Sequence, residues 1–473
     1  MKSLIYIVCF LSLISFILNS EESKNVKYIE YSFKRNLTID KIIKPEDFFK
    51  TYFFNQLYIN ITVGSNKNEI PFYFYLQQFP LVLQSSNVEQ TEVKGKYDEL
   101  KSDTYKELVP DNIEIFKNGD LNEGILSKDI FYFNNNDKSY INFYLSKKNF
   151  GDAHITEGGK IGFMAYPSYK ENKSSSFITN LKENNLISYE IFYFKYDSDK
   201  INEDSGKLYI GAHPHYFNKE QYNNDYYIAG DAYTAVDGFD WVYFIDDIKI
   251  ADNEPYERAK QAYFYLELGF IIGSDNFFKI LNHSKIWNEY FNVTKKCHKI
   301  DFNIEGFESN DENVRFYYLF TGYYCDKDVD ISKLDIGDIS FIKKQIDYTF
   351  NISNKDLWIE NNNYKYFMIL QTSSDENIWF FGKPFFKKYP MVFDFNNKVI
   401  GFYSKIFPPK NYDENKKKHK HTLAYVLVII GLVIVIIGLV FLLIKCYYLL
   451  PRNKRANELT DDNFDYNVND DLN

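Results

Sequence analysis

Residues 262–273, AYFYLELGFIIG, decide the fold, because an earlier stretch at residues 72–83, FYFYLQQFPLVL, repeats their pattern. Each stretch places Tyr-Phe-Tyr-Leu before a polar residue, Glu267 in one and Gln77 in the other, and then returns to apolar residues. One such apolar turn in each half of the chain predicts a two-lobed β protein with a pseudo-dyad between its lobes. The residues on that dyad are the first place to look for function.

Composition is compatible with this architecture and excludes several classes of partner. The 473 residues, 45% of them apolar, are enough for two lobes with hydrophobic cores, and the 42 Tyr and 44 Phe favour strands. A formal net charge of −10, with no basic stripe interleaved with aromatic residues, argues against nucleic acid as a partner. We also find no glycine-rich phosphate loop, so no nucleotide site is predicted.

Apolar segments near both termini predict a membrane-anchored secretory protein. Residues 1–20 read as a signal peptide, with an apolar core and a cleavage site near Ser20. Residues 423–444 form an uncharged run of 22 residues, which spans about 33 Å as a helix and therefore predicts a single transmembrane helix. Because basic residues flank this run on both sides, the cleaved signal sets the orientation as type I. The ectodomain is then lumenal or extracellular, in the secretory or endolysosomal pathway or at the cell surface, and the acidic tail at residues 445–473 is cytosolic.

Cysteines and glycosylation motifs agree with a lumenal ectodomain. Cys9 leaves with the signal peptide and Cys446 lies at the cytosolic membrane edge, so Cys297 and Cys325 are the pair on the oxidising side. We predict a disulfide between them, worth about 3–4 kcal/mol for a loop of this length. The N-glycosylation motifs, some of which arise by chance in an Asn-rich chain, are at Asn36, Asn60, Asn172, Asn282, Asn292 and Asn351.

The segment between the signal peptide and the membrane helix divides into four predicted parts. They are a prosegment-like stretch at residues 21–50, an N-terminal lobe at 51–205, a C-terminal lobe at 206–407 and a polar stalk at 408–422. No linker rich in Gly, Pro or Ser separates the lobes, so we expect an extensive interface between them.

The pattern within these parts is rich in short strands. Residues 27–34, KYIEYSFK, alternate like an edge strand and lead to a loop at Lys44 and Pro45. Short helices are expected at residues 176–184, 274–282 and 383–388.

Several motifs follow one another in a specific order. They are NITVG at residues 60–64 with IPFYFY at 70–75, GKIGFMAYPS at 159–168, SFITNLKENNLISYEIFY at 176–193, GKLYIG at 206–211 with DWVYFIDDIKI at 240–250, the cysteines at 297 and 325, and WFFGKPFFKKYPMVFDFNNKVIGF at 379–402. With these motifs, residues 27–405 resemble a pepsin-like aspartic peptidase of family A1. The resemblance implies a mostly β, bilobal fold, here followed by the single transmembrane helix.

In that family each lobe contributes an Asp-Thr-Gly triplet, and the two carboxylates meet on the dyad and share a proton. The resemblance aligns these triplets with Tyr75, Leu76 and Gln77 and with Tyr265, Leu266 and Glu267. Neither triplet retains Asp, Thr or Gly, and Lys117 stands where the family's flap carries a Tyr. The parallel change in both triplets indicates a repacked centre in which an apolar contact has replaced polar groups.

Glu267 is the one acid in the two triplets and is the candidate for a substitute catalytic group. One carboxylate must take a proton from water while another polarises the scissile carbonyl, so a single carboxylate cannot perform both steps. The simpler reading places Glu267 on a solvated cleft wall or opposite Lys117. Tyr75 and Tyr265 are phenols with an ordinary pKa near 10, which makes them poor bases and favours a packing role.

Other constellations of reactive residues are weaker. His213 and His215 flank a Pro in a turn, have no third ligand nearby and are typical of a surface loop, so no metal is predicted. No serine lies in a nucleophile elbow, and no cofactor is expected.

The sequence therefore favours a catalytically inactive pepsin-like homologue. Its ectodomain would bind a peptide or protein ligand in the interlobe cleft or serve as a scaffold. The alternative is a divergent aspartic-type endopeptidase that carries out proteolysis in the secretory or endolysosomal pathway, and a third hypothesis is a structural glycoprotein. An open space between Tyr75 and Tyr265 would support a ligand, whereas a filled one would support a scaffold.

Overall fold

The computed structural model describes most of the chain between residues 26 and 407. The described residues are 26–35, 42, 44–76, 81–86, 96–108, 124–133, 137–146, 158–163, 176–198, 204–235, 238–251, 256–304, 319–334, 336–361, 363–372 and 378–407. The chain divides into two units, Met1–Pro408 and Pro409–Asn473, and every described residue lies in the first. Within the described residues no helix is long and apolar enough to cross a membrane. The predicted signal peptide, stalk, transmembrane helix and cytosolic tail lie outside the described residues and stay predictions.

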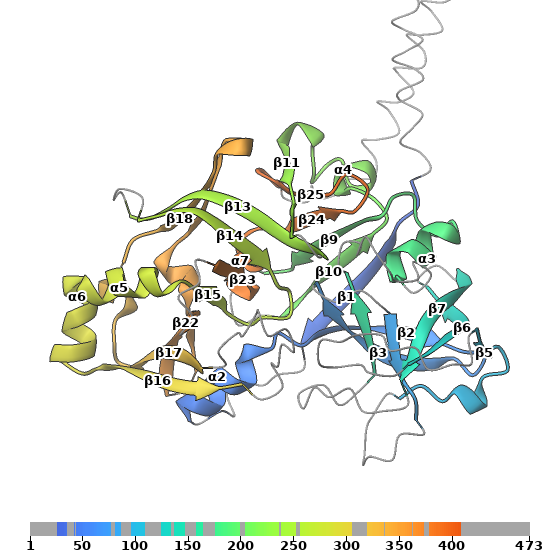
Figure 1. The fold of residues 1–473 in the computed structure, drawn as a ribbon, viewed down its shortest axis with the longest axis horizontal. Helices are drawn as coiled ribbons and strands as arrows, with labels where there is room; N and C mark the ends of the chain where they lie inside the picture. Colours follow the sequence, from blue (N-terminus) through green and yellow to red (C-terminus); the bar gives the residue numbers. More distant parts are fainter. Residues whose placement is uncertain are drawn as a thin grey trace, which may run out of the picture. The chain divides into compact units, whose positions relative to one another are not determined.

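The fold is mostly β, and its first sheet has 13 strands (Figure 1). Their order is β11 (Tyr227–Asp231), β25 (Val399–Tyr403), β24 (Met391–Asp394), β9 (Ile191–Tyr196), β10 (Ser205–Ile210), β1 (Ile29–Arg35), β2 (Leu57–Val63), β3 (Asn68–Tyr75), β8 (Gly159–Gly162), β4 (Leu81–Gln84), β7 (Lys138–Ser146), β6 (Ile125–Tyr132) and β5 (Lys106–Glu107). This sheet contains both the first and the last strand of the described chain. It therefore takes strands from both sides of the predicted lobe boundary at residue 205.

The second sheet has 12 strands, all from the second half of the chain. The main path is β19 (Tyr348–Ile352), β18 (Ile339–Lys343), β13 (Gly238–Ile250), β14 (Glu257–Phe264), β23 (Ile378–Phe381), β15 (Ile271–Gly273), β22 (Ile369–Thr372), β17 (Leu319–Asp326), β21 (Tyr364–Phe367) and β20 (Trp358–Glu360). In addition, β12 (Tyr233–Ala235) pairs with β13, and β16 (Cys297–Asn303) pairs with β17. The α-helices are α2 (Pro45–Phe53), α3 (Phe177–Glu183), α4 (Pro214–Phe217), α5 (Asp275–His283), α6 (Lys285–Asn288) and α7 (Lys383–Lys388).

One pairing pattern occurs in both sheets. In the first sheet, β3 runs parallel to β8, β4 runs antiparallel to β8, and β4 runs parallel to β7. In the second sheet, β14 runs parallel to β23, β15 runs antiparallel to β23, and β15 runs parallel to β22. The duplication that the repeated Tyr-Phe-Tyr-Leu pattern predicted is therefore confirmed at the level of strand pairing.

The three short helices expected from the sequence are present as α3, α5 and α7, and two of them begin at a serine cap. The Ser176 hydroxyl accepts a hydrogen bond from the Thr179 backbone N–H, and the Ser274 hydroxyl accepts one from that of Phe277. Such caps satisfy N–H groups that a helix leaves without intrahelical partners.

Two local predictions at the N-terminus were wrong. Residues 27–34 were expected as an edge strand, but β1 lies inside the first sheet, paired with β10 along its length and with β2 at its end. Pro45 was expected in a loop, but it is the first residue of α2. A proline fits at that position because its missing N–H would have no intrahelical partner there, and Glu46 and Asp47 complement the helix dipole.

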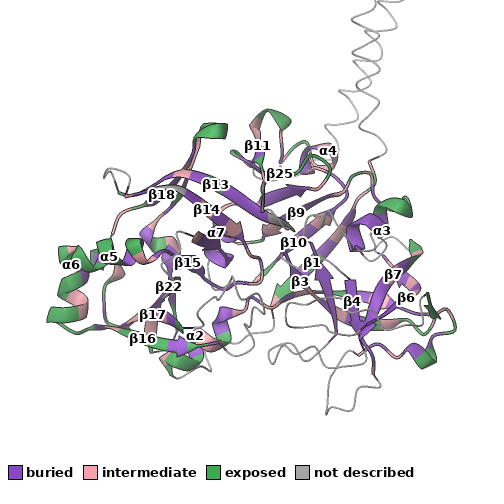
Figure 2. Cartoon of the chain, viewed as in Figure 1, coloured by how far each residue is buried: buried purple, intermediate pink, exposed green. Residues whose placement is uncertain are grey.

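Helix α2 is anchored in the core by four aromatic side chains. Phe48, Phe49, Tyr52 and Phe53 follow helical spacing, and all are fully buried. Figure 2 shows that α2 carries both buried and exposed positions. The four aromatic side chains belong to a hydrophobic cluster whose other members, such as Phe270, come from the second half of the chain. The fit is close, because a Cβ at Gly322 would lie 2.6 Å from the Phe49 ring. The N-terminal segment is thus part of the core.

The predicted disulfide between Cys297 and Cys325 is present. The two residues lie directly opposite each other on β16 and β17, so the bond closes the hairpin that these strands form. Both cysteines are buried.

Removal of this bond is expected to destabilise the protein. The Cys297→Ala/Cys325→Ala variant should lose about 3–4 kcal/mol of unfolding free energy, because the unfolded chain regains the entropy that a bond across 28 residues removes. Denaturant titration of the full-length protein measures the loss, with Cys446→Ala as the matched control. Equal stability of the two variants would contradict the prediction.

Candidate functional site

The first triplet lies at the end of β3, in a buried setting. Tyr75 and Leu76 are buried, and the backbone carbonyl of Tyr75 accepts a hydrogen bond from the Phe163 N–H at 2.7 Å. The carbonyl of Phe163 accepts one from the Trp241 indole at 2.6 Å, so two motifs of the resemblance meet beside this triplet. Lys160, also buried, places its Nζ 5.2 Å from the centre of the Tyr75 ring, within cation–π range. Gln77 and Lys117 lie outside the described residues.

The second triplet forms a turn between β14 and β15. Leu266 is buried, whereas Tyr265 and Glu267 are partly exposed. The Tyr265 ring packs edge-on against Phe380 at 5.4 Å between centroids. This ring contact agrees with the packing role favoured for Tyr265 in the sequence.

One hydrogen bond joins the two triplets directly. The Glu267 carboxylate, through Oε2, accepts a hydrogen bond from the backbone N–H of Leu76 at 3.3 Å. The structure therefore brings the two halves of the sequence repeat into contact, as the pseudo-dyad required. The hypothesis that Glu267 faces Lys117 is not tested, because Lys117 lies outside the described residues.

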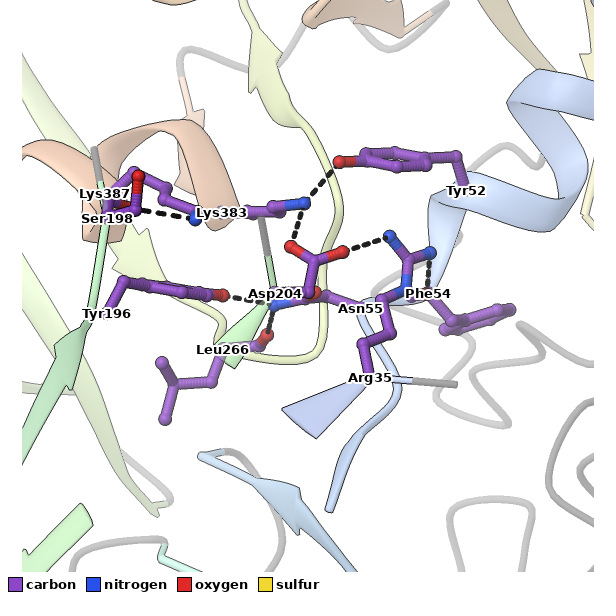
Figure 3. A network of polar contacts seen from close by, with 10 residues as sticks. All are labelled: Arg35, Tyr52, Phe54, Asn55, Tyr196, Ser198, Asp204, Leu266, Lys383 and Lys387. Carbon is purple, nitrogen blue, oxygen red and sulfur yellow. Dashed lines mark hydrogen bonds and ion pairs between the residues drawn. The ribbon is translucent and has the colours of Figure 1, made fainter. Parts of the chain in front are cut away.

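Asn55 holds the second triplet in place through hydrogen bonds to its backbone carbonyls. The sequence analysis did not identify this residue. Its backbone N–H donates to the Glu267 carbonyl at 2.6 Å, and its side-chain amide donates to the Leu266 carbonyl at 2.9 Å and to the Tyr196 hydroxyl at 2.8 Å (Figure 3). Asn55 is buried. The polar pair Asn55 and Gln56 between the apolar residues Phe54 and Leu57 is the signal that could have indicated it.

The segment of α2 that precedes Asn55 lies on the same turn. The backbone N–H of Gly269 donates to the Phe53 carbonyl at 2.7 Å. A Cβ at Gly269 would lie 1.9 Å from the carbonyl oxygen of Tyr52, so only glycine fits here. The turn that follows the second triplet is therefore covered by the protein's own N-terminal helix.

A buried ionic cluster continues from this turn, and the sequence analysis did not identify it either (Figure 3). Lys383 forms an ion pair with Asp204 and donates a hydrogen bond to the Tyr52 hydroxyl. Asp204 also pairs with Arg35 at 3.5 Å. These residues come from distant parts of the sequence, so no local sequence pattern predicts that they lie in contact.

The histidines weighed as a metal site lie at the start of α4, and each faces a polar side chain. His215 Nδ1 lies 2.7 Å from the Tyr403 hydroxyl, and His213 Nε2 lies 3.7 Å from the Asp394 carboxylate. Burial lowers the pKa of His215 to about 4, so this ring is neutral at physiological pH. Across the described residues, no group of three or more His, Cys, Asp or Glu could hold a metal ion.

The described glycosylation motifs are accessible. The exposed asparagines are Asn60, Asn282, Asn292 and Asn351. Asn36 and Asn172 lie outside the described residues. Glycosylation itself stays a prediction.

Three surface hollows lie elsewhere among the described residues. The hollow beside Lys27 and Lys207, the hollow beside Ile280 and the hollow beside Tyr216 contain no triplet residue. The contact given between the two triplets is the hydrogen bond from the Leu76 N–H to the Glu267 carboxylate.

Comparison with known proteins adds one finding. Residues 56–260 match the family model described as "Eukaryotic aspartyl protease". The match includes the first triplet and ends just before the second. The comparison with curated proteins gives no match.

Proposed function

We propose that this protein, whose residues 56–260 match the eukaryotic aspartyl protease family model, is a catalytically inactive pepsin-like homologue that serves as a membrane-anchored scaffold ectodomain. The observation that carries this proposal is the contact between the two triplets. Leu76 and Leu266 are buried, and the one carboxylate, that of Glu267, accepts a hydrogen bond from the Leu76 N–H. This direct contact between the triplets supports a scaffold role.

The chemistry of the family supports the same proposal. Hydrolysis by an aspartic dyad needs one ionised and one protonated carboxyl group on either side of the attacking water. Tyr75 and Tyr265 stand at those positions and supply phenols, which stay protonated at any pH below about 9. Among the described triplet residues Glu267 supplies the one carboxyl group, so the second carboxyl group of a dyad is absent there.

The membrane anchor and the secretory location of the proposed scaffold rest on the sequence. They are supported by the apolar segments at residues 1–20 and 423–444, by the four exposed glycosylation motifs and by the disulfide. A protein or peptide partner would then bind the outer surface of the ectodomain.

Absence of peptidase activity is the expected result of the decisive test. The full-length protein, purified in detergent, is incubated with an unbiased peptide library at pH 3–7, with and without pepstatin. An active pepsin-like peptidase in the same detergent shows that the assay detects cleavage. Pepstatin-sensitive cleavage by this protein at any of these pH values would overturn the proposal.

One observation favours the alternative, a divergent endopeptidase: Glu267 carries a carboxylate at the contact between the two halves. The Glu267→Gln variant separates the two hypotheses, because glutamine keeps the hydrogen-bond acceptor and removes the acid. A scaffold gives no cleavage in either form. An endopeptidase that depends on Glu267 gives cleavage in the wild type and a loss of at least about 100-fold in the variant.

A further inference from the structure

Lys383 is the most enclosed charged residue at the junction between α2 and α7. It is the first residue of α7, and its side chain is completely buried. Its ammonium group pairs with Asp204 and donates a hydrogen bond to the hydroxyl of Tyr52 on α2. Its Nζ also lies 4.8 Å from the centre of the Tyr52 ring. One side chain thus contacts both the N-terminal helix and the residue that precedes β10.

Two more cations belong to the same cluster, and one of them pairs with the same carboxylate. Arg35, at the end of β1, pairs with Asp204, donates to the Phe54 carbonyl at 2.9 Å and lies 4.2 Å from the centre of the Tyr52 ring. Lys387, one turn along α7 from Lys383, donates to the Ser198 carbonyl at 3.0 Å. Figure 3 shows these side chains converging from β1, α2, α7 and the segment before β10.

The charge balance of this cluster is unfavourable for the ammonium form of Lys383. Burial lowers the pKa of Lys383 to about 7; the Asp204 carboxylate opposes this shift, and the positive charges of Arg35 and Lys387 add to it. Arg35 keeps its charge at every accessible pH. Burial raises the pKa of Tyr52 and of Tyr196, so these phenols stay neutral. Lys383 is therefore the group of the cluster expected to change its charge near neutral pH.

We propose that Lys383 is a proton-sensitive clamp, which holds α2 against α7 when its amine is neutral and loosens α2 when the amine is protonated. The neutral amine still donates hydrogen bonds to Asp204 and Tyr52. Protonation adds a third positive charge around one carboxylate in a site that water does not reach. The released segment includes Tyr52 and Phe53, which cover the turn after the second triplet.

The direction of the pH dependence follows from linkage. A lysine amine that is exposed in the unfolded or released state has a pKa near 10.4, which is well above the pKa of Lys383 in the folded protein. Between pH 7 and that value the released state binds more protons, so the clamped state gains stability as the pH rises. Below the pKa of Lys383 in the folded protein, the amine is protonated in both the clamped and the released state. The pH then no longer changes the relative stability of the two states. For one such group, opening at pH 6 should be about tenfold more frequent than at pH 8.

Hydrogen exchange of the full-length protein tests the clamp. Protection of the α2 amides, corrected for intrinsic exchange rates, should fall about tenfold from pH 8 to pH 6. In Lys383→Met, which keeps the length and apolar volume of the side chain, protection of α2 should be the same at both pH values. Lys279→Met, an exposed lysine of α5 paired with Asp275, is the matched control and should behave like the wild type. A wild type without pH dependence, or a Lys383→Met variant that keeps it, would overturn the proposal.

A second measurement follows the charge of the Lys383 amine directly. NMR of the full-length protein labelled with ¹³C-lysine follows the titration of each amine, and Lys383 is assigned by its absence in Lys383→Arg. A midpoint near pH 7 supports the clamp. A midpoint above about 10, the value of an unperturbed lysine, would refute it.

Discussion

Replacing Asp204 by alanine is expected to cost about 3–5 kcal/mol of unfolding free energy at pH 6. The side chain of Arg35 is 2% exposed and that of Lys383 is fully buried, so the variant leaves two cations in the core without their shared carboxylate. Desolvation makes such uncompensated charges far more costly than the loss of a surface ion pair. Denaturant titration of the full-length protein measures the effect.

The matched control for this experiment is Asp328→Ala. Asp328 pairs with Lys296 at 2.7 Å, but both side chains are well exposed, so no measurable shift of the unfolding midpoint is expected. A loss at Asp204 below about 1 kcal/mol would show that the cluster is solvated and would contradict the prediction.

Replacing Phe49 by alanine is expected to destabilise the protein by about 3–5 kcal/mol, because the substitution opens a cavity between α2 and the second sheet. Phe49 is fully buried, stacks with Phe302 at 5.4 Å between centroids and lies against Gly322. Thermal and denaturant unfolding of the full-length protein give the loss.

Thr51→Ala, on the exposed face of the same helix, controls for helix propensity and should change stability by less than about 0.5 kcal/mol. If Phe49→Ala and Thr51→Ala have equal effects, α2 does not pack as the structure shows. This experiment also bears on the prosegment-like stretch at residues 21–50. A chain that loses this stretch loses β1 and most of α2, including Phe48 and Phe49.

Sequence patterns predicted much of the architecture because those patterns are local. Strand alternation, the serine caps of α3 and α5 and the spacing of motifs are all readable within a few residues. The disulfide could be predicted from the compartment in which its two cysteines lie. The pairing of the two triplets could be predicted from the sequence repeat. Each of these predictions concerns residues whose environment their neighbours in sequence already indicate.

The parts that could not be predicted depend on contacts between distant residues. An alternating strand such as β1 has the same pattern at an edge and inside a sheet, and its place depends on β10, about 175 residues later. Asn55, Asp204 and Lys383 are unremarkable polar residues in sequence, and only the fold buries them together. Their importance follows from burial, which composition and periodicity do not report for single polar residues.

The position of β1 and α2 in the fold also has a consequence for synthesis. Both leave the ribosome first, but β1 pairs with residues 205–210, and Phe48 stacks on Tyr366. Translation of the roughly 300 residues in between takes on the order of 15–60 s at 5–20 residues per second. During that interval the aromatic side chains of α2 lack the packing partners that later strands supply, such as Tyr366, which makes the nascent chain a substrate for chaperones until nearly all of the ectodomain has been made.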